Sequence, residues 1–255
     1  LHRHHQARMA GPTSDPSMLL ENLGKDAEWN FKRDPARIPR PPVELNSNHG
    51  DLHAGWLDVD NDGLLDLLIA SSDYPDDQLL TLWHQKAGGS FEDWTPRLGL
   101  RWINAAQISL ADVDRDGATD ILVATSNTRL KAEQLKDRSL DVGVLRNMEP
   151  ARNGNRFLSI RLKGAGKGKS NTDAVGARVT VWTGDLRQTR EVYGGLGCGG
   201  HRDDGECRFG MGKALKADKI EVRWPDGKST IQTFTDVATN AFYILEEGKT
   251  LKAAK

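Results

Sequence analysis

The stretch at residues 58–70, DVDNDGLLDLLIA, decides the fold, because it places four aspartates within nine residues directly beside an apolar run. The pattern returns 54 residues later as DVDRDGATDILVA, at residues 112–124. Carboxylates this close repel one another: at an effective dielectric constant of about 20, two charges about 4 Å apart cost roughly 4 kcal/mol. A folded loop therefore holds them together only if they take up protons or surround a cation.

The spacing of the aspartates indicates a cation site. Alternate positions of the first loop carry side-chain donors, a glycine then allows a sharp turn, and a backbone carbonyl can point inward. The predicted ligands are Asp58, Asp60, Asp62, the Leu64 carbonyl and Asp66 in the first loop, and Asp112, Asp114, Asp116, the Ala118 carbonyl and Asp120 in the second. Hard oxygen donors in a flexible loop suit Ca²⁺, whereas Mg²⁺ demands a stricter octahedron and keeps its waters.

The loop is not that of an EF-hand, which needs a bidentate Glu at its twelfth position. Ile69 and Val123 occupy that position here, and the flanking LLIAS and ILVAT indicate strands. Two alternatives stay open. Aspartate side chains also stabilise metal-free turns by bonding to nearby backbone N–H groups, and paired carboxylates can be catalytic. Two copies with identical spacing favour the metal over both.

Most of the chain consists of short runs rich in apolar and β-branched residues, each bounded by Gly, Asn, Asp or Pro. Examples are DLLIA, DILVAT, FLSIRL, ARVTVW, KIEVRW and AFYILE, whereas helical periodicity is scarce. This pattern is typical of an all-β protein. WPDGKST at residues 224–230 predicts a hairpin, because Pro225 sets φ for a turn and Gly227 supplies a positive φ.

A second element recurs alongside the aspartate stretches: an apolar strand end, a polar or glycine-rich turn and then an aromatic residue. Its copies begin at Leu19, Leu80 and Gly143, and their spacing of roughly sixty residues is the size of a four-stranded propeller blade. No aspartate stretch precedes the first copy, so we expect the chain to begin inside a blade. A propeller needs about four to eight blades, so a longer precursor or another chain would supply the rest. An open β-sheet is the alternative.

The composition changes near residue 150, where the repeats stop and the polar segment MEPARNGN follows. We expect a tail with the end of a preceding blade at 1–45, two aspartate repeats at 46–150, and a small β domain at 155–250. The net charge of −1 points to neither nucleic acid nor anionic lipid as a partner. The longest apolar runs are too short to span a bilayer, which takes about 20 residues.

Three further motifs are candidate disulfide, phosphate or metal sites. Cys198 and Cys207 lie in one glycine-rich loop, where a disulfide is favoured over free thiols and over a metal site that includes His201. A disulfide would indicate an oxidising compartment. GAGKGKS at 164–170 lacks both the glycine spacing and the following helix of a phosphate-binding loop. A metal site at His2, His4 and His5 is disfavoured, because terminal segments are usually poorly ordered.

The two aspartate stretches resemble the FG-GAP/VCBS repeats of integrin α-subunit propellers and bacterial surface proteins. The second half resembles the ASPIC/UnbV domain at SNTDAVGARVTVW (170–182), REVYGGLGCGG…CRFGMG (190–212) and KIEVRWPDGKS (219–229). Their combination in this order is similar to the cartilage acidic protein family and its bacterial relatives. The resemblance implies secretion, calcium-stabilised propeller blades with calcium at the aspartates named above, and a binding or adhesion role. Most blades of that family are missing here, and its loop after the paired glycines usually lacks the two cysteines.

We therefore expect a non-enzymatic, extracellular, cell-surface or periplasmic calcium-binding protein that serves binding, adhesion or scaffolding as part of a larger assembly. Its partner would be the chain or precursor that completes the propeller, together with a glycan or matrix ligand. One alternative is a carbohydrate-binding lectin. In it, exposed repeat tryptophans would stack on sugars rather than pack in a core; the candidates are Trp56, Trp83, Trp94 and Trp102. The other alternative is an accessory chain of a secreted enzyme complex.

Overall fold

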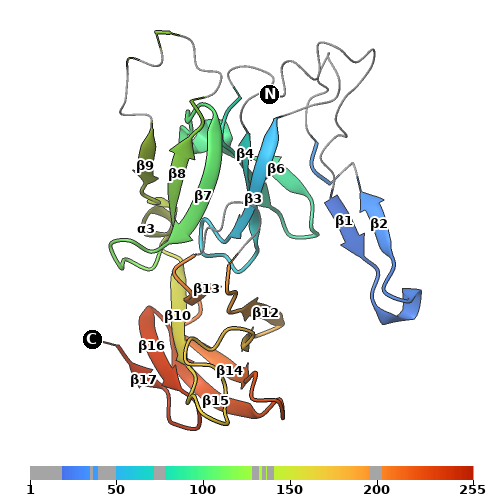
Figure 1. Ribbon diagram of the computed structural model, residues 1–255, viewed down its shortest axis with the longest axis vertical. Coiled ribbons are helices and arrows are strands. Elements are labelled where there is room, and N and C mark those ends of the chain that lie inside the picture. The colour runs from blue at the N-terminus through green and yellow to red at the C-terminus, as the bar shows by residue number, and fades with distance from the viewer. Residues whose placement is uncertain are drawn as a thin grey trace. The chain divides into compact units, whose positions relative to one another are not determined.

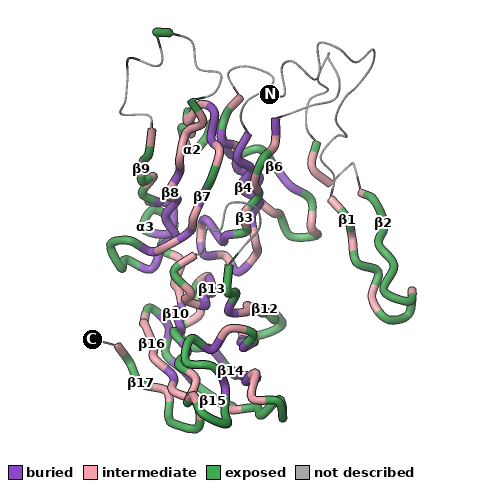
Figure 2. Tube along the Cα trace, in the orientation of Figure 1, coloured by how far each residue is buried: buried purple, intermediate pink, exposed green. Residues whose placement is uncertain are grey.

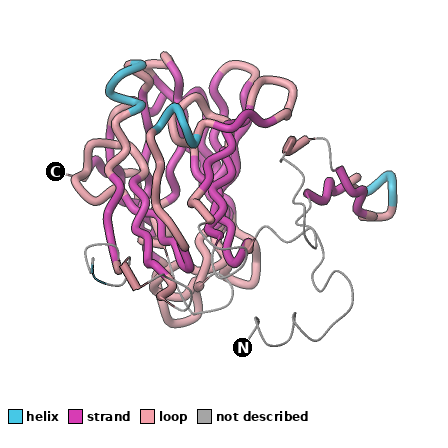
Figure 3. Tube along the Cα trace, turned by 90° about the horizontal axis from the view of Figure 1, so that it is seen from above, coloured by secondary structure: helices cyan, strands magenta, loops and turns pink. Residues whose placement is uncertain are grey.

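A computed structural model of the chain describes residues 19–34, 37–39, 50–71, 78–127, 132–133, 136, 141–195 and 203–254. Regular structure in these residues is almost entirely β (Figure 1), as the short apolar runs predict. The helical elements there are short: the 3-10 turn η1 (Lys25–Ala27) and the helices α2 (Thr95–Leu98) and α3 (Glu149–Asn153) (Figure 3). In the described part of the chain, no helix has the length and apolar character needed to cross a membrane.

The chain divides into two compact units, each built from several segments. The repeat unit comprises residues 1–57, 65–108 and 122–144, and the C-terminal unit comprises residues 58–64, 109–121 and 145–255. The aspartate loops therefore belong to the C-terminal unit, up to Leu64 in the first copy and up to Ile121 in the second.

The first aspartate loop connects two strands of a four-stranded antiparallel sheet, which has the size of one propeller blade. Its strands follow chain order: β3 (Asp51–Leu57), β4 (Asp66–Ser71), β5 (Thr81–Gln85) and β6 (Phe91–Asp93). Every residue of β4 is buried (Figure 2), which explains why its middle, residues 67–70, is continuously apolar rather than alternating. Leu57 pairs with Asp66, so the loop begins and ends at the same edge of the sheet.

The second aspartate loop connects the first two strands of a three-stranded sheet. This sheet contains β7 (Ala105–Ala111), β8 (Asp120–Thr125) and β9 (Val142–Leu145), again in chain order. A separate hairpin of β1 (Leu19–Asn22) and β2 (Phe31–Asp34) is the remaining copy of the repeated element. Across the described residues these sheets stay open, and none closes into a barrel.

The C-terminal unit contains two four-stranded sheets that share one apolar core. Their strand orders are β12-β11-β14-β15 and β13-β10-β16-β17. The core combines Val181 and Ile220 of the first sheet with Ile160 and Phe209 of the second. The pair β10–β16 is parallel and the others are antiparallel. The strands are β10 (Arg156–Lys163), β11 (Arg178–Thr183), β12 (Leu186–Glu191), β13 (Cys207–Gly212), β14 (Lys216–Arg223), β15 (Ile231–Ala238), β16 (Ala241–Glu246) and β17 (Lys252–Ala253).

The predicted hairpin at 224–230 is confirmed as the connection between β14 and β15. The Trp224 N–H donates to the Thr230 carbonyl over 2.9 Å. Asp226 holds the turn, because its Oδ1 accepts from the N–H groups of Lys228 (3.0 Å) and Thr230 (3.1 Å). Gly227 has φ 76°, the positive value that the turn requires.

Candidate metal sites in the aspartate loops

The second aspartate loop, which lies wholly in the C-terminal unit, is shaped by bonds from its own backbone to its own side chains. Asp112 accepts from the N–H groups of Asp116 (3.1 Å) and Gly117 (2.9 Å). Asp116 in turn accepts from the Ala118 N–H over 2.9 Å. Gly117 has φ 90°, so the sharp turn predicted from the glycine is present.

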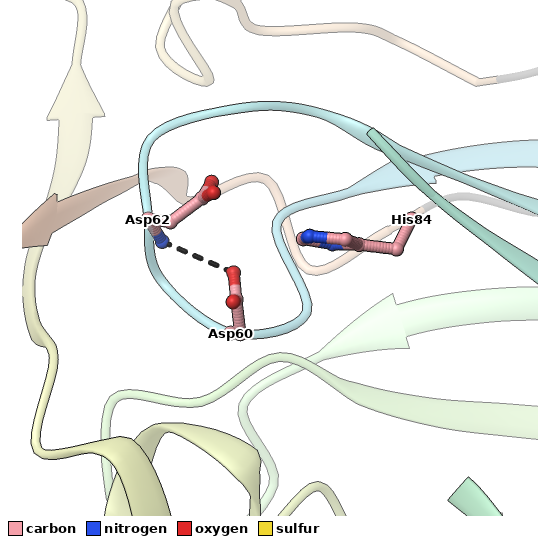
Figure 4. A group of neighbouring side chains, drawn as sticks. All are labelled: Asp60, Asp62 and His84. Carbon is pink, nitrogen blue, oxygen red and sulfur yellow. Dashed lines mark hydrogen bonds between the residues drawn. The ribbon is translucent and has the colours of Figure 1, made fainter. Parts of the chain in front are cut away.

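The first loop makes the same bonds at the same positions. Asp58 accepts from the N–H groups of Asp62 (3.0 Å) and Gly63 (2.8 Å), and Asp62 accepts from the Leu64 N–H (2.8 Å). Figure 4 shows the Asp62 N–H also donating to Asp60, over 3.3 Å. Because two distant segments adopt one bonding pattern, the pattern follows from the shared local sequence.

In the second loop the structure brings together the first, third and ninth positions of the motif, because Asp112, Asp114 and Asp120 each offer an oxygen within 4.8 Å of the others. In the first loop, Asp58 and Asp60 likewise offer oxygens within 4.8 Å of each other. The fifth-position side chains, Asp62 and Asp116, accept the backbone bonds described above, and Asp62 also offers an oxygen within 4.8 Å of one from Asp60. Calcium ligation by them and by the Leu64 and Ala118 carbonyls stays a prediction.

The ninth-position aspartates are deeply buried, with exposures of 0% for Asp66 and 1% for Asp120. Asp66 accepts from the Gln85 N–H over 2.8 Å, and its Oδ1 lies 2.9 Å from His84 Nδ1. Asp120 makes the equivalent bond to the Asn147 N–H, also over 2.8 Å. These bonds fix the orientation of each carboxylate at the start of the strand that follows its loop.

Charged neighbours from later in the chain also face the loops. Arg146 forms ion pairs with Asp114 and, at 3.5 Å, with Asp116. Burial raises the pKa of Asp112, and the charge of Asp116 adds to that rise. Burial lowers the pKa of Arg190, whereas the nearby charge of Asp58 raises it. The sequence had indicated none of these cations as neighbours of the loops.

Three asparagines of the segment 147–155 bond to the backbone of the first loop. The side-chain amides of Asn153 and Asn155 both donate to the Asp60 carbonyl over 2.8 Å. The amide of Asn147 donates to the Val59 carbonyl over 2.7 Å. The segment MEPARNGN, which the sequence indicated only as a domain boundary, therefore fixes one of the loops.

The loops also contact each other and strand β13. Asn61 is buried, and its amide donates to the Gly117 carbonyl of the second loop over 3.0 Å. The Gly212 N–H donates to the Asn61 carbonyl over 2.9 Å. A Cβ on Gly210 would lie 2.6 Å from Asn61 Cα and would also collide with the Asp58 carboxylate. Only a glycine therefore fits at position 210 while the first loop keeps its place.

The donor set fits a hard divalent cation. The bonds from backbone N–H groups are those of an aspartate turn that can form without metal. Such a turn needs one carboxylate, whereas the second loop gathers three within 4.8 Å of one another. Their mutual repulsion is what a cation offsets, and oxygen-only donors suit calcium-like ions. Both loops thus hold acidic groups that could bind a metal ion.

The remaining predicted sites fare differently. Cys207 is a buried free thiol whose burial raises its pKa to about 12. Its predicted disulfide partner Cys198 lies outside the described residues, as do His201 and the three terminal histidines His2, His4 and His5. Of the repeat tryptophans, Trp83 and Trp94 are buried, and Trp56 is 46% exposed.

The loop at 164–170 that mimics a phosphate-binding loop encloses a carboxylate of the protein itself. The N–H groups of Ala165 and Ser170 both donate to Glu247 Oε2 over 3.0 Å. β11 follows this loop, as the sequence predicts, where a nucleotide-binding loop would have a helix. The amides that could cradle a phosphate are thus occupied by Glu247.

Comparison with known proteins finds two family models that match separate parts of the chain. Residues 58–123 match the family model of the FG-GAP-like repeat, and residues 166–252 match that of ASPIC and UnbV. No match to this chain was found among curated proteins. One solved structure, a proposed cell adhesion protein from Bacteroides uniformis ATCC 8492, is 12% identical over 80% of this chain and 89% of that chain. Its TM-score is 0.24.

Proposed function

Because this chain joins FG-GAP-like repeats to an ASPIC/UnbV domain, we propose that it is an extracellular calcium-binding protein that acts by binding or adhesion. The observation that carries the proposal is the convergence of three carboxylates in the second loop, whose aspartate spacing the first loop repeats. FG-GAP repeats often hold calcium, and the aspartates of this chain occupy the positions that such a role requires.

In this proposal, calcium strengthens the C-terminal unit from within. That unit includes the first loop up to Leu64 and the whole second loop, and backbone carbonyls of the first loop accept bonds from Asn147, Asn153 and Asn155. An ion that orders the loops would therefore fix the surface on which these asparagines and β13 rest. Because the ion binds the folded loop far better than the unfolded chain, calcium adds to the free energy of unfolding.

The proposed role is non-enzymatic. Among the described side chains that could act as nucleophile or base, Cys207 has a pKa near 12 and is buried. His84 lies against Asp66 and stacks on Trp94 with ring centroids 3.6 Å apart. These contacts account for both residues as structural elements.

The proposed partner is a further set of propeller strands, from another chain or from a longer precursor. Support comes from the exposed apolar side chains of the β1–β2 hairpin (Figure 2): Trp29 and Phe31 are each 62% exposed. Phe91, which takes the place of Phe31 in the complete copy of the repeated element, is only 6% exposed in its four-stranded sheet. A matching sheet would bury the hairpin in the same way.

The test is thermal unfolding of the full chain in calcium, in magnesium and in a chelator. We expect Tm to fall by several degrees on chelation and to recover with calcium but not with magnesium. Asp112→Asn should remove the second loop's share of that calcium dependence, whereas Asp185→Asn, on an exposed residue outside the loops, should leave the dependence intact. An identical Tm in all three solutions would leave the loops as metal-free turns and refute the calcium site.

A further inference from the structure

The outer face of the sheet β12-β11-β14-β15 carries features of a binding surface. Val179 and Val181 of β11 are fully buried in the core, so the alternation of the strand places Arg178 and Trp182 on the opposite face. Ile220 of β14 is likewise in the core, which places its neighbours on the outer face as well. We define the outer face by Arg178, Thr180, Trp182, Arg187, Thr189, Glu191, Lys219, Glu221, Arg223, Ile231, Thr233 and Thr235.

The register places an aromatic ring between two cations at one end of this face. Trp182 pairs with Arg187 on one side and with Lys219 on the other. The Arg187 guanidinium carbon lies 5.6 Å from the ring centroid, and Lys219 Nζ lies 4.6 Å from it. Adjacent strands are about 4.8 Å apart, so this row spans about 10 Å across three strands.

The charges of the outer face are not balanced. Four cations, Arg178, Arg187, Lys219 and Arg223, stand against two acids, although the whole chain has a net charge of −1. Both acids already have cationic partners: Glu191 pairs with Arg178 at 3.0 Å, and Glu221 with Lys219 at 2.8 Å. The face therefore carries a local excess of two positive charges, which complements a polyanion.

The polar groups between the charges are hydroxyls. Thr189, Thr233 and Thr235 are exposed on the outer face. Cross-strand ion pairs and an edge tryptophan also occur on solvated sheets that bind nothing, where they stabilise the sheet. Stabilising such a sheet does not require an excess of positive charge or several exposed hydroxyls beside the aromatic ring.

We propose that the outer face binds an acidic polysaccharide. Arginine and lysine would contact its sulfate or carboxylate groups, Trp182 would pack against an apolar sugar face, and the threonines would bond to sugar hydroxyls. A polysaccharide is favoured over a nucleic acid because the exposed threonine hydroxyls beside the cations match a hydroxyl-rich sugar chain, whereas single-stranded nucleic acid is bound by several aromatic rings that stack successive bases and the outer face offers one. The proposal rests on the extracellular setting proposed above.

The test measures binding of the calcium-saturated full chain to dextran sulfate, with neutral dextran, single-stranded DNA and polyglutamate as comparisons. We expect binding to dextran sulfate alone, weakened about tenfold or more by Arg187→Glu with Lys219→Glu. Trp182→Ala should weaken it less. The matched control is Lys167→Glu with Lys169→Glu, an equal charge change on the exposed residues of the 164–170 loop.

Equal loss of binding in both double variants would overturn the proposal, because the binding would then reflect overall charge. Equal binding to polyglutamate or to DNA would overturn it as well, the first indicating simple ion exchange and the second a nucleic-acid surface. Circular dichroism and thermal unfolding of each variant establish that it folds. Since no loop aspartate is changed, failure here leaves the calcium dependence of Tm, and hence the proposed function, untouched.

Discussion

The two aspartate loops share their backbone bonds but differ in the charge that the next strand brings to them. In the first copy, the residue before Gln85 is His84, which contacts Asp66. In the second copy, the residue before Asn147 is Arg146, which forms ion pairs with two aspartates of its loop. The comparison teaches that local sequence sets the shape of a loop, whereas a distant residue sets its electrostatic environment.

The loops also differ in what packs on them. The first is fixed by asparagines and by Gly212, which bond directly to its backbone, and its Asn61 amide reaches the second loop at Gly117. The equivalent position of the second loop is Arg115, whose guanidinium instead lies over the Phe242 ring, 4.2 Å from its centroid. The first loop is therefore sensitive to small changes of shape, and the second to changes of charge.

The largest expected effect comes from breaking the close packing on the first loop. Gly210→Ala would place a Cβ 2.6 Å from Asn61 Cα, so the strand or the loop must move. We expect the free energy of unfolding to fall by roughly 3 kcal/mol, measured by urea denaturation in calcium. Met211→Leu, the volume-conserving control on the neighbouring buried residue, should cost less than about 1.5 kcal/mol.

If Gly210→Ala unfolds at the same urea concentration as the parent chain, β13 does not press on the first loop. The contrast between a shape-sensitive and a charge-sensitive loop would then be wrong. A loss of stability equal to that of Met211→Leu would argue the same way, since it would show ordinary repacking of a core.

Much of this architecture could be predicted from the sequence. The aspartate spacing, with Gly63 and Gly117, identified both loops, because the residues that shape each one lie within nine positions of one another. The apolar runs identified the strands on either side, and Pro225 with Gly227 located a hairpin that is present. The shared principle is that each of these features is local.

What the sequence did not reveal depends on contacts between distant segments. Asn153 and Asn155 lie more than 90 positions from the Asp60 carbonyl to which they donate, and a lone asparagine in a polar segment has no periodicity that names its partner. Gly210 was visible only as part of a motif, since a glycine required by close approach resembles one required by a turn. The parallel pair β10–β16 joins the two ends of the C-terminal domain and leaves no local signal either.

A smaller effect, on calcium affinity, is expected from removing the charge of Arg146 beside the second loop. Arg146→Gln removes a positive charge from beside the second loop, where Ca²⁺ would otherwise meet it as a like charge. For an exposed group the repulsion is worth about 1 kcal/mol, so calcium affinity at this loop should rise roughly fivefold. Isothermal titration at low salt measures it.

The control for Arg146→Gln is Arg152→Gln, because Arg152 is exposed and pairs with Glu149 at 2.8 Å instead of with a loop aspartate. Its calcium affinity should match that of the parent chain, and added salt should shrink the difference between the two variants. A drop in affinity in Arg146→Gln would mean that Arg146 supports the metal-bound loop, and that its charge is not a competitor.

The smallest expected effect compares the loops with the hairpin at Asp226, where one carboxylate forms a turn with no acidic neighbour in the turn. Bonds from Thr230 and Lys228 lower the pKa of Asp226 to about 2, whereas burial raises the pKa of Asp112. The two pKa shifts are therefore opposite in sign. Asp226 supports the fold above the unfolded pKa of about 3.8, and this support is lost as pH falls through about 2. In the metal-free chain, Asp112 supports the fold only while protonated, so that support is lost as pH rises through its raised pKa.

Carboxyl NMR titrations with and without calcium would resolve the two groups. Asp226 should titrate near pH 2 in both samples, because its bonds come only from its own turn. Asp112 should titrate above its ordinary value without calcium and fall on adding it, since a bound cation favours the charged carboxylate. A calcium-induced shift at Asp226 would show that the ion acts through the whole domain, and an unmoved Asp112 would remove it from the metal site. The hairpin thus supplies, within the same chain, the reference against which a turn built by hydrogen bonds alone can be told from one that needs an ion.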